Sequence, residues 1–347
     1  MSLLDTVRQE IRANGIGNFD SFENRKQRNG LLQTALAFNN SPMSVTNAIA
    51  ADVNAGNYGV DKKIIALNKD DTAAGDTRTC SPAGGESTSA LYTVTRNVAT
   101  FDITMYPSEY GQNDVAFQQD LARKLYNAEN ALAKKIDGDL YTNLDSAKNL
   151  TYDSPFVGAG KRYELTAGTL QVEETRQDFF FNDLKSIVMA ENVEDQLFVV
   201  GDAQLMSYYM KYSNQGGQNA ANLNFQFNGY GWNFSNSVAT TAGKSSTGFA
   251  MPVGSYGVLM NNTPDSVAGR TAGNKSWSTM TLPQNLLGQA VSVYEVTDCA
   301  DASSLGSSPV GLENTYKMDI QLSIDYHIIT PYSSDANKAP IYKFDFE

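Results

Sequence analysis

Apolar residues recur at every third or fourth position between Asn113 and Asn149, a stretch that contains no proline. This spacing puts them on one side of a helix and predicts a single helix over about residues 114–147. At ~1.5 Å per residue the helix would be ~50 Å long. Asp120 and Lys124 are spaced to form an ion pair on it. The apolar stripe consists of Phe117, Leu121, Leu125, Ala128, Leu132, Ile136, Leu140 and Leu144.

Near the other end of the sequence, apolar residues occupy every second position of "YKMDIQLSIDYHIITPY", from Tyr316 to Ile328. Such alternation predicts a long strand with one buried face. The stripe of the long helix departs from a strict heptad, which disfavours a coiled coil. We therefore expect the helix to cover this strand, although the two are far apart in the sequence.

Another long strand is predicted in "ALYTVTRNVATFDITMY", Ala90 to Tyr106. Its apolar residues change from one face to the other near Ala99. The change predicts a bulge, or a strand that passes from one packing environment to another.

The middle of the chain alternates between helical and strand patterns. "FNDLKSIVMAENVEDQ" and "DAQLMSYYMKYSNQGG" are predicted helices, and "LFVVG" is a predicted buried strand. "GYGWNFSNSV", "GFAMPVGSYGVLMNN" and "QAVSVYEVTDC" predict further strands. A compact mixed domain is expected over about residues 160–300, and the fold class is α+β.

The first 90 residues hold few apolar residues that could form a core. Leu3, Leu4, Val7 and Ile11 make one short amphipathic segment, and a short strand is predicted in "KKIIALN". "KDDTAAGDTRTCSPAGGEST" is a long loop without an apolar anchor, and loops of this length are commonly functional. These segments are expected to need a partner surface.

Composition narrows the class of protein. The 347 residues are 41% hydrophobic and 18% charged, with a net charge of −12. The chain is therefore globular. Its acidity disfavours binding to nucleic acid, because such binding depends on Lys and Arg contacts with phosphate. Cys80 and Cys299 are expected to be reduced. The N-terminus lacks the apolar segment of a secretory signal, and the longest apolar run is too short to span a membrane.

Catalytic chemistry finds little support in the residues. His327 is the single histidine, and we expect it to be exposed on the polar side of its strand. Most catalytic triads and most zinc sites need more histidines or a nucleophile beside one, so a single histidine disfavours them. Asp137 and Asp139 do not share a helix face. The glycine-rich turns match no phosphate-binding pattern, and the loop with Asp70, Asp71 and Asp76 lacks the spacing of a calcium site. We predict no catalytic, cofactor-binding or metal-binding residue.

The order of these parts resembles the HK97-like major capsid fold of tailed bacteriophages. "ALAKKIDGDLYTNL" is similar to the end of that family's spine helix, and "FVVGDAQLMSYYMKY" followed by "FNGYGWNFSNSV" is similar to its axial domain. The resemblance implies an N-terminal arm over 1–40, an extended E-loop over 41–90, a peripheral P-domain over 91–155 and 305–347, and an inserted axial A-domain over 156–304.

The resemblance also implies a function. Such proteins assemble as hexamers and pentamers into an icosahedral shell around double-stranded DNA, without sequence-specific binding and without a membrane. The N-arm and E-loop would contact neighbouring subunits, and portal, scaffolding and decoration proteins would be partners. Because the sequence begins at Met1, we expect a separate scaffolding protein. Assembly would take place in the host cytoplasm, and the mature location would be the virion capsid.

Two alternatives remain at this point. One is an encapsulin-type nanocompartment shell protein of the same fold, and the weaker one is a small-oligomer enzyme with an unrecognised site. Some capsid proteins cross-link a loop lysine to a neighbour's asparagine. Lys62, Lys63 and Lys69 lie in the expected loop, but no partner can be assigned, so no cross-link is predicted.

Overall fold

The computed structural model describes residues 28–41, 45–55, 61–65, 80, 89–110, 114–191, 193, 196–216, 230–301, 314–331 and 338–347. These residues fall into two compact units. The first contains Arg96–Ile136 and Met260–His327, and the second contains Arg28–Thr95, Asp137–Leu259 and Ile328–Glu347. Both units combine helices with sheets, which confirms the α+β class.

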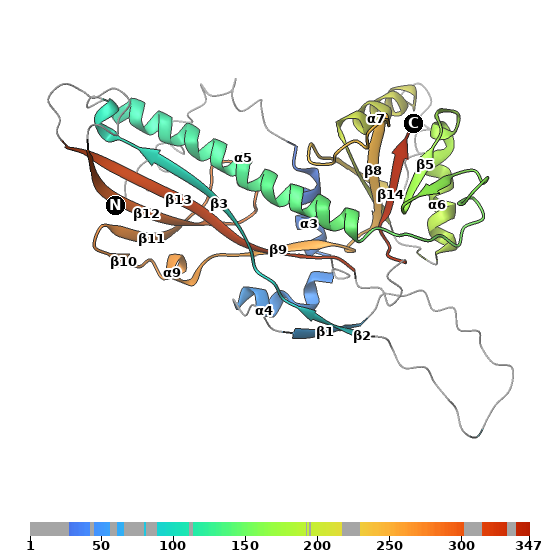
Figure 1. The fold of residues 1–347 in the computed structure, drawn as a ribbon, viewed down its shortest axis with the longest axis horizontal. Coiled ribbons are helices and arrows are strands. Elements are labelled where there is room, and N and C mark those ends of the chain that lie inside the picture. Colours follow the sequence, from blue (N-terminus) through green and yellow to red (C-terminus); the bar gives the residue numbers. More distant parts are fainter. Residues whose placement is uncertain are drawn as a thin grey trace. The chain divides into compact units, whose positions relative to one another are not determined.

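The first unit is built on an antiparallel sheet, and the part of helix α5 (Asp114–Ser146) that belongs to this unit, up to Ile136, lies along one face of it (Figure 1). A short 3-10 turn, η3 (Pro107–Tyr110), leads into the helix, and a short helix, α9 (Pro264–Val267), precedes the first hairpin. Strand β9 (Gly257–Asn261) also pairs with β13. In sheet order the other strands are β10 (Thr271–Ala272), β11 (Lys275–Met280), β12 (Val291–Asp301), β13 (Asn314–Ile329) and β3 (Asn97–Met105).

Helix α5 confirms the predicted long helix to within a residue or two. Every residue of the predicted apolar stripe, from Phe117 to Leu144, is buried. Asp120 and Lys124 form the expected ion pair at 3.2 Å, and Tyr110 donates a hydrogen bond to Asp120 at 2.7 Å. Lys124 Nζ also donates to the carbonyl oxygen of Thr104 in β3, 3.1 Å away. This bond ties the helix directly to the sheet of the first unit.

Strand β13 confirms the predicted alternation. Leu322 stands opposite Phe101 of β3 and Val293 of β12. Directly opposed residues of an antiparallel pair point to the same side of the sheet, so the three strands share one apolar face. The residues of β13 on that face are buried: Met318, Ile320, Leu322, Ile324, Tyr326 and Ile328.

The strand predicted over Ala90–Tyr106 is two strands. Strand β2 (Ser89–Thr93) pairs with β1 (Asp61–Ile65) in a separate two-stranded sheet, whereas β3 pairs with β13. The predicted change of packing environment is confirmed. Its position is not near Ala99, because that residue already shares the buried face of β3 with Ile103.

The second unit contains a six-stranded mixed sheet. Helices α6 (Phe180–Ala190) and α7 (Ala203–Gly216) belong to it, and they confirm the two helices predicted in the middle of the chain. The other helical segments of the unit are α3 (Gly30–Asn39), η2 (Val45–Ala48), α4 (Ala50–Asn54) and η4 (Glu174–Phe179). In sheet order the strands are β4 (Glu164–Thr166), β5 (Thr169–Val172), β14 (Tyr342–Phe346), β8 (Ser246–Pro252), β6 (Leu197–Gly201) and β7 (Tyr230–Phe234).

An aromatic core holds the second unit together. Phe180 of α6 packs against Phe344 and Phe346 of β14, with ring centroids 4.8 and 5.6 Å apart. Phe181 packs against Trp232 of β7 at 4.8 Å. Aromatic side chains bury large apolar areas, and edge-to-face contacts add to the stabilisation.

The units divide the chain differently from the predicted domains. The predicted A-domain, 156–304, contained β11 and β12, which in the structure pair with each other and extend the sheet of β13. The predicted P-domain, 305–347, contained β14, which lies in the sheet of the second unit. The resemblance implied those boundaries, whereas pairing between strands decides membership of a sheet.

The predicted arm, 1–40, is described only from residue 28 onward. There the chain forms helix α3, whose Leu31, Leu32, Ala35 and Phe38 are at most 2% exposed. This helix is part of the core of the second unit. The amphipathic segment around Val7 lies outside the described residues and stays a prediction.

Candidate assembly surfaces

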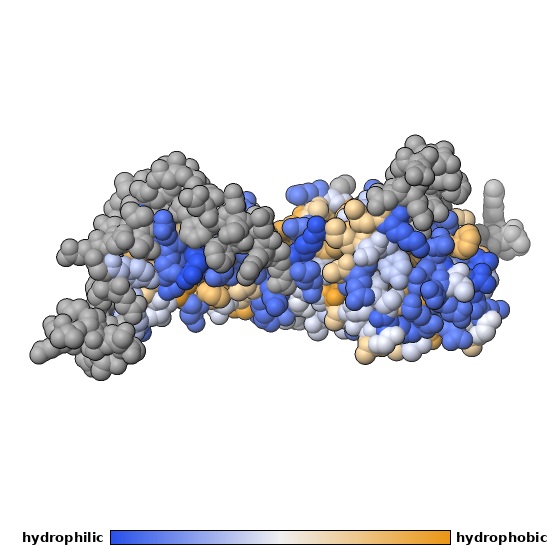
Figure 2. Space-filling view, turned by 90° about the horizontal axis from the view of Figure 1, so that it is seen from above, coloured by the Kyte–Doolittle hydropathy of each residue, from blue (hydrophilic) through white to orange (hydrophobic). Residues whose placement is uncertain are grey.

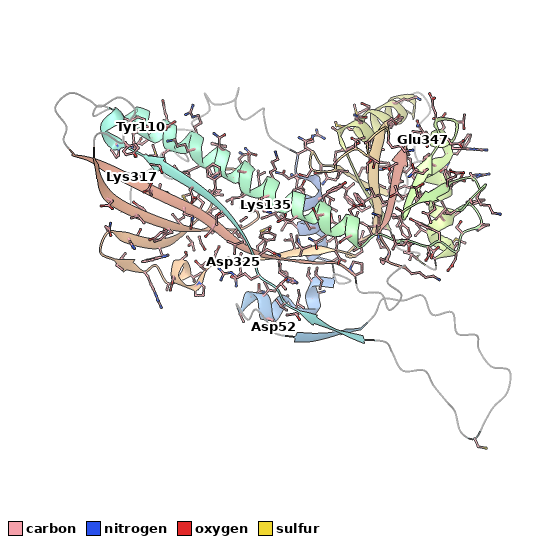
Figure 3. The ribbon with its side chains drawn as sticks, viewed as in Figure 1. Asp52, Tyr110, Lys135, Lys317, Asp325 and Glu347 are labelled. Atoms are coloured by element: carbon pink, nitrogen blue, oxygen red, sulfur yellow. The ribbon has the colours of Figure 1, made fainter. Side chains whose placement is uncertain are left out.

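His327 is placed differently from expectation. It is 1% exposed, because both faces of β13 are covered at this end of the strand. Its neighbour Asp325 is also buried, and Arg96 donates to that carboxylate at 2.8 Å (Asp325 is labelled in Figure 3). The imidazole of His327 is thus shielded from solvent by the described residues around it.

Some of the other candidate residues lie outside the part of the chain that the structure describes. Asp70, Asp71, Asp76 and Lys69 are not among the described residues, and the side chains of β1 and of Cys299 are not described either. Cys80 is exposed. Within the described part of the chain, no group of three or more His, Cys, Asp or Glu side chains could hold a metal ion. No described helix is long and apolar enough to cross a membrane.

Asp137 of α5 is fully buried in the second unit, and Asp139 lies on another side of the helix. The Asp137 carboxylate accepts hydrogen bonds from the backbone N–H of Leu32, at 2.8 Å, and from the hydroxyl of Ser235. Leu32 belongs to the first turn of α3, whose own N-cap residue, Asn29, makes no capping bond. Asp137 therefore caps α3 from a different helix.

The burial of Asp137 has an energetic consequence. Burial raises the pKa of its carboxyl above 3.8, although the hydrogen bonds from Ser235 and Leu32 act in the opposite direction. A raised pKa in the folded state means that the contribution to stability is fully present below the unfolded pKa. It is lost as the pH rises through the folded pKa.

We expect Asp137→Asn to cost little at neutral pH, because the amide oxygen still accepts a hydrogen bond and no buried charge remains. Asp137→Ala should lower the free energy of unfolding by about 3 kcal/mol, because it leaves buried donors without an acceptor. Urea unfolding between about pH 4 and pH 7 should show the wild type losing stability relative to Asp137→Asn as the pH rises. A constant difference between the two over this range would contradict the assignment.

Glu129 is the corresponding buried carboxylate of the first unit. It is fully buried in α5, and its two oxygens accept hydrogen bonds from the backbone N–H groups of Gln284 and Leu286, at 2.7 and 2.6 Å. Both residues lie in the connection between β11 and β12. The carboxylate thus fixes this connection to the helix, and each oxygen satisfies a backbone donor.

We expect Glu129→Ala to lower the free energy of unfolding by about 3 kcal/mol, because two backbone donors lose a charged acceptor. Hydrogen exchange should show the amides of Gln284 and Leu286 losing protection more than those of β13. Glu164→Ala, at an exposed position, serves as the matched control and should leave both stability and exchange unchanged. Full protection of Gln284 in Glu129→Ala would show that the carboxylate is dispensable there.

A third polar site lies in the second unit. Asp202 is 3% exposed, and each of its carboxylate oxygens accepts two hydrogen bonds. One oxygen is bound by Leu205 N–H and Ser246 Oγ, at 2.8 and 3.0 Å. The other is bound by Thr240 Oγ1 and Thr247 N–H, at 2.6 and 3.0 Å.

These contacts decide what the third site can do. Thr247 also donates its hydroxyl to Asp345 at 2.7 Å, which links two buried carboxylates into one network. All four lone-pair positions of Asp202 are occupied by donors of the protein itself. Because the protein's own donors fill these positions, we assign the network a structural role.

Exposed apolar side chains mark a surface on the second unit. Phe179, at the start of α6, is 59% exposed, and Met189, near its end, is 67% exposed. The buried side of α6 carries Phe180, Leu184 and Ile187, so the helix presents apolar residues on both sides. We call Phe179 and Met189 the α6 patch. In Figure 2 apolar residues form small separate areas on a largely hydrophilic surface, and isolated exposure of this kind is normal unless it is used for contact.

The hairpin of β1 and β2 is the second candidate surface. Its five residue pairs run from Asp61–Thr93 to Ile65–Ser89. Among the described residues these strands pair only with each other, and a two-stranded hairpin is at best marginally stable by itself. Such a ribbon is suited to being completed by another surface.

No protein-family model matches the sequence, and no curated protein matches it significantly. Solved structures are distantly similar in fold. A chain of Mycobacterium phage Ogopogo is 9% identical with a TM-score of 0.46, over 93% of this chain and 93% of that chain.

Two further structures of similar fold are assemblies. The capsid of Ralstonia phage GP4 is 11% identical with a TM-score of 0.39, over 83% of this chain and 82% of that chain. The encapsulin complex of Synechococcus elongatus is 10% identical with a TM-score of 0.35, over 75% of each chain. All three TM-scores are below 0.5, so the function proposed next rests on the geometry of this chain.

Proposed function

We propose that this protein is a shell-forming structural protein, the HK97-like major capsid protein of a tailed bacteriophage. The first unit carries the proposal. Helix α5 has 33 residues, and its part in this unit, up to Ile136, lies along a sheet whose paired strands β3 and β13 are far apart in sequence. Asp102 and Gln321, which are hydrogen-bonded to each other, are 219 positions apart. A long helix on a long sheet, with other structure inserted between its strands, is the arrangement that the resemblance implies.

The candidate surfaces support the same proposal. The β1–β2 hairpin is paired only with itself among the described strands, and the α6 patch offers exposed apolar side chains for contact. In a shell, each would be covered by a neighbouring copy of the chain. Burying a side chain such as Phe or Met contributes roughly 1.5–3 kcal/mol, and this contribution is repeated at every copy of the contact. The chain is proposed to act as a structural subunit and not as a catalyst.

The proposal includes the expected partners and location. The chain would form hexamers and pentamers, contact its neighbours through the N-terminal arm and the hairpin region, and work with portal, scaffolding and decoration proteins. It would be assembled in the host cytoplasm and reside in the virion capsid. A net charge of −12 is compatible with enclosing DNA without binding it, because like charges repel.

Negative-stain electron microscopy of the purified chain after size-exclusion chromatography tests the proposal. Closed shells, tubes or free hexamers are expected. Double-stranded DNA inside particles isolated from cells would support the virus, whereas an enclosed protein cargo would point to a nanocompartment. A monodisperse monomer or dimer that assembles under no salt or crowding condition would overturn the proposal.

A further inference from the structure

Strand β14 occupies an unusual place in the sheet of the second unit. It lies between β5, with which it pairs in parallel, and β8, with which it pairs antiparallel. Among the described strands no other joins the two sides, since the order is β4-β5-β14-β8-β6-β7. Without β14 the described sheet would separate into a β4–β5 hairpin and a three-stranded block.

Both faces of β14 are buried, and each is held by a different chemistry. Phe344 and Phe346 enter the aromatic core beside α6. On the opposite face, Lys343 Nζ lies 2.8 Å from the carboxylate of Asp145, and Asp345 accepts the hydroxyl of Thr247. Every residue from Tyr342 to Phe346 is buried. The strand therefore completes the core on one side and the polar network on the other.

The order of synthesis adds the decisive point. β14 follows every other described strand of both units in the sequence. A chain synthesised only through β13 already contains every strand of the sheet of the first unit. The sheet of the second unit, in contrast, still lacks its joining strand. Glu347, labelled in Figure 3 beside β14, adds a hydrogen bond from its N–H to the carbonyl of Val172 at 3.0 Å.

We propose that insertion of β14 is a folding checkpoint, which admits a chain to assembly only after β14 has been made and has entered its sheet. The second unit remains incomplete until β14 enters between β5 and β8. Partial chains, although their first unit is formed, are thereby kept out of growing particles. The part of this inference that concerns assembly rests on the proposed function, whereas the part that concerns strand insertion does not.

The test uses the full-length chain with Phe344→Asp, which places a charge in the aromatic core and opposes insertion of β14. Phe344→Leu keeps an apolar side chain at the same site. Phe179→Asp makes the same chemical change at an exposed position of the same unit and serves as the control for folding. Hydrogen exchange is measured for the amides of β6 and β8 in the second unit and of β12 and β13 in the first.

Phe344→Asp is expected to lose protection in β6 and β8 while β12 and β13 keep theirs. Phe344→Leu and Phe179→Asp should keep protection in both units. In cells that co-express the wild type, tagged Phe344→Asp should be absent from particles, whereas tagged Phe344→Leu should be incorporated.

Three outcomes would overturn the checkpoint. They are retained protection of β6 and β8 in Phe344→Asp, simultaneous loss of protection in both units, and incorporation of Phe344→Asp at the wild-type proportion. If the wild type itself forms no particles, the proposed function fails. The exchange measurement then still decides whether β14 insertion completes the second unit, so the two failures can be told apart.

Discussion

Asp202→Ala is expected to lower the free energy of unfolding of the second unit by about 4 kcal/mol. The substitution removes a buried acceptor on which four donors converge: Leu205 N–H, Ser246 Oγ, Thr240 Oγ1 and Thr247 N–H. A buried donor left without a partner costs roughly 1–3 kcal/mol. The two hydroxyls can turn to other partners, whereas the two backbone groups cannot, which sets the estimate below the simple sum.

Urea unfolding measures this effect if the second unit has its own probe. The chain contains two tryptophans. Trp232 packs against Phe181 in the second unit, and Trp277 packs against Tyr294 in the first. In a Trp277→Phe background, the fluorescence of Trp232 therefore reports the second unit.

Two control variants make the Asp202 measurement specific. Asp202→Asn should cost less than alanine, because one oxygen remains as an acceptor. Asp265→Ala removes a carboxylate that is 51% exposed and paired with Arg270, and it should change stability by less than about 0.5 kcal/mol. An Asp202→Ala protein as stable as the Asp265→Ala protein would refute the structural role of the network.

The double variant Phe179→Asp/Met189→Asp is expected to fold normally and to form no particles. Both side chains are largely exposed, so charges there meet water in the free chain and cost little stability. In an assembled contact the same charges would be buried without partners, which is strongly unfavourable. Far-ultraviolet circular dichroism and urea unfolding check the fold, and electron microscopy checks assembly.

Val267→Asp is the matched control for the α6 patch. Val267 is also 67% exposed, but it lies on α9 of the first unit, and we assign it no role in contact. This variant should assemble like the wild type. Normal shells from the double variant would show that the α6 patch is not a contact between copies. Loss of particles in Val267→Asp but not in the double variant would move the contact to α9.

Periodicity predicted the elements that pack through one long apolar face. The stripe from Phe117 to Leu144 and the described part of the alternation, from Met318 to Ile328, are both buried as expected. Each signal spans many residues and depends only on the repeat of the local structure. The strand of β6 and the helices α6 and α7 were predicted for the same reason.

Short or polar patterns were missed or misplaced. "YKFDF" of β14 alternates aromatic with charged residues, which is typical of a half-exposed strand, and it was not assigned as a strand. In the structure it lies in the middle of a sheet, because Lys343 finds Asp145 and Asp345 finds Thr247. The alternation of Tyr342, Phe344 and Phe346 was the available signal. His327 was expected to be exposed because polar residues on a strand are usually solvated.

The buried carboxylates could not have been found from sequence. Glu129 and Asp137 lie in α5 among ordinary polar positions, and spacing correctly indicated only that Asp137 and Asp139 do not form a pair. Their partners are backbone groups at Gln284, Leu286 and Leu32, more than 100 residues away in each case. A backbone N–H leaves no trace in the sequence, since every residue except proline has one.

The amino-acid sequence by itself determined the long helix, its stripe and the strand β13, because local periodicity requires no knowledge of distant residues. Tertiary structure alone decided which strands share a sheet, where β14 inserts and which carboxylates are buried. Those choices depend on pairing between segments that are far apart along the chain. A polar side chain that would otherwise prefer water can be buried when the folded chain supplies a hydrogen-bond partner for it.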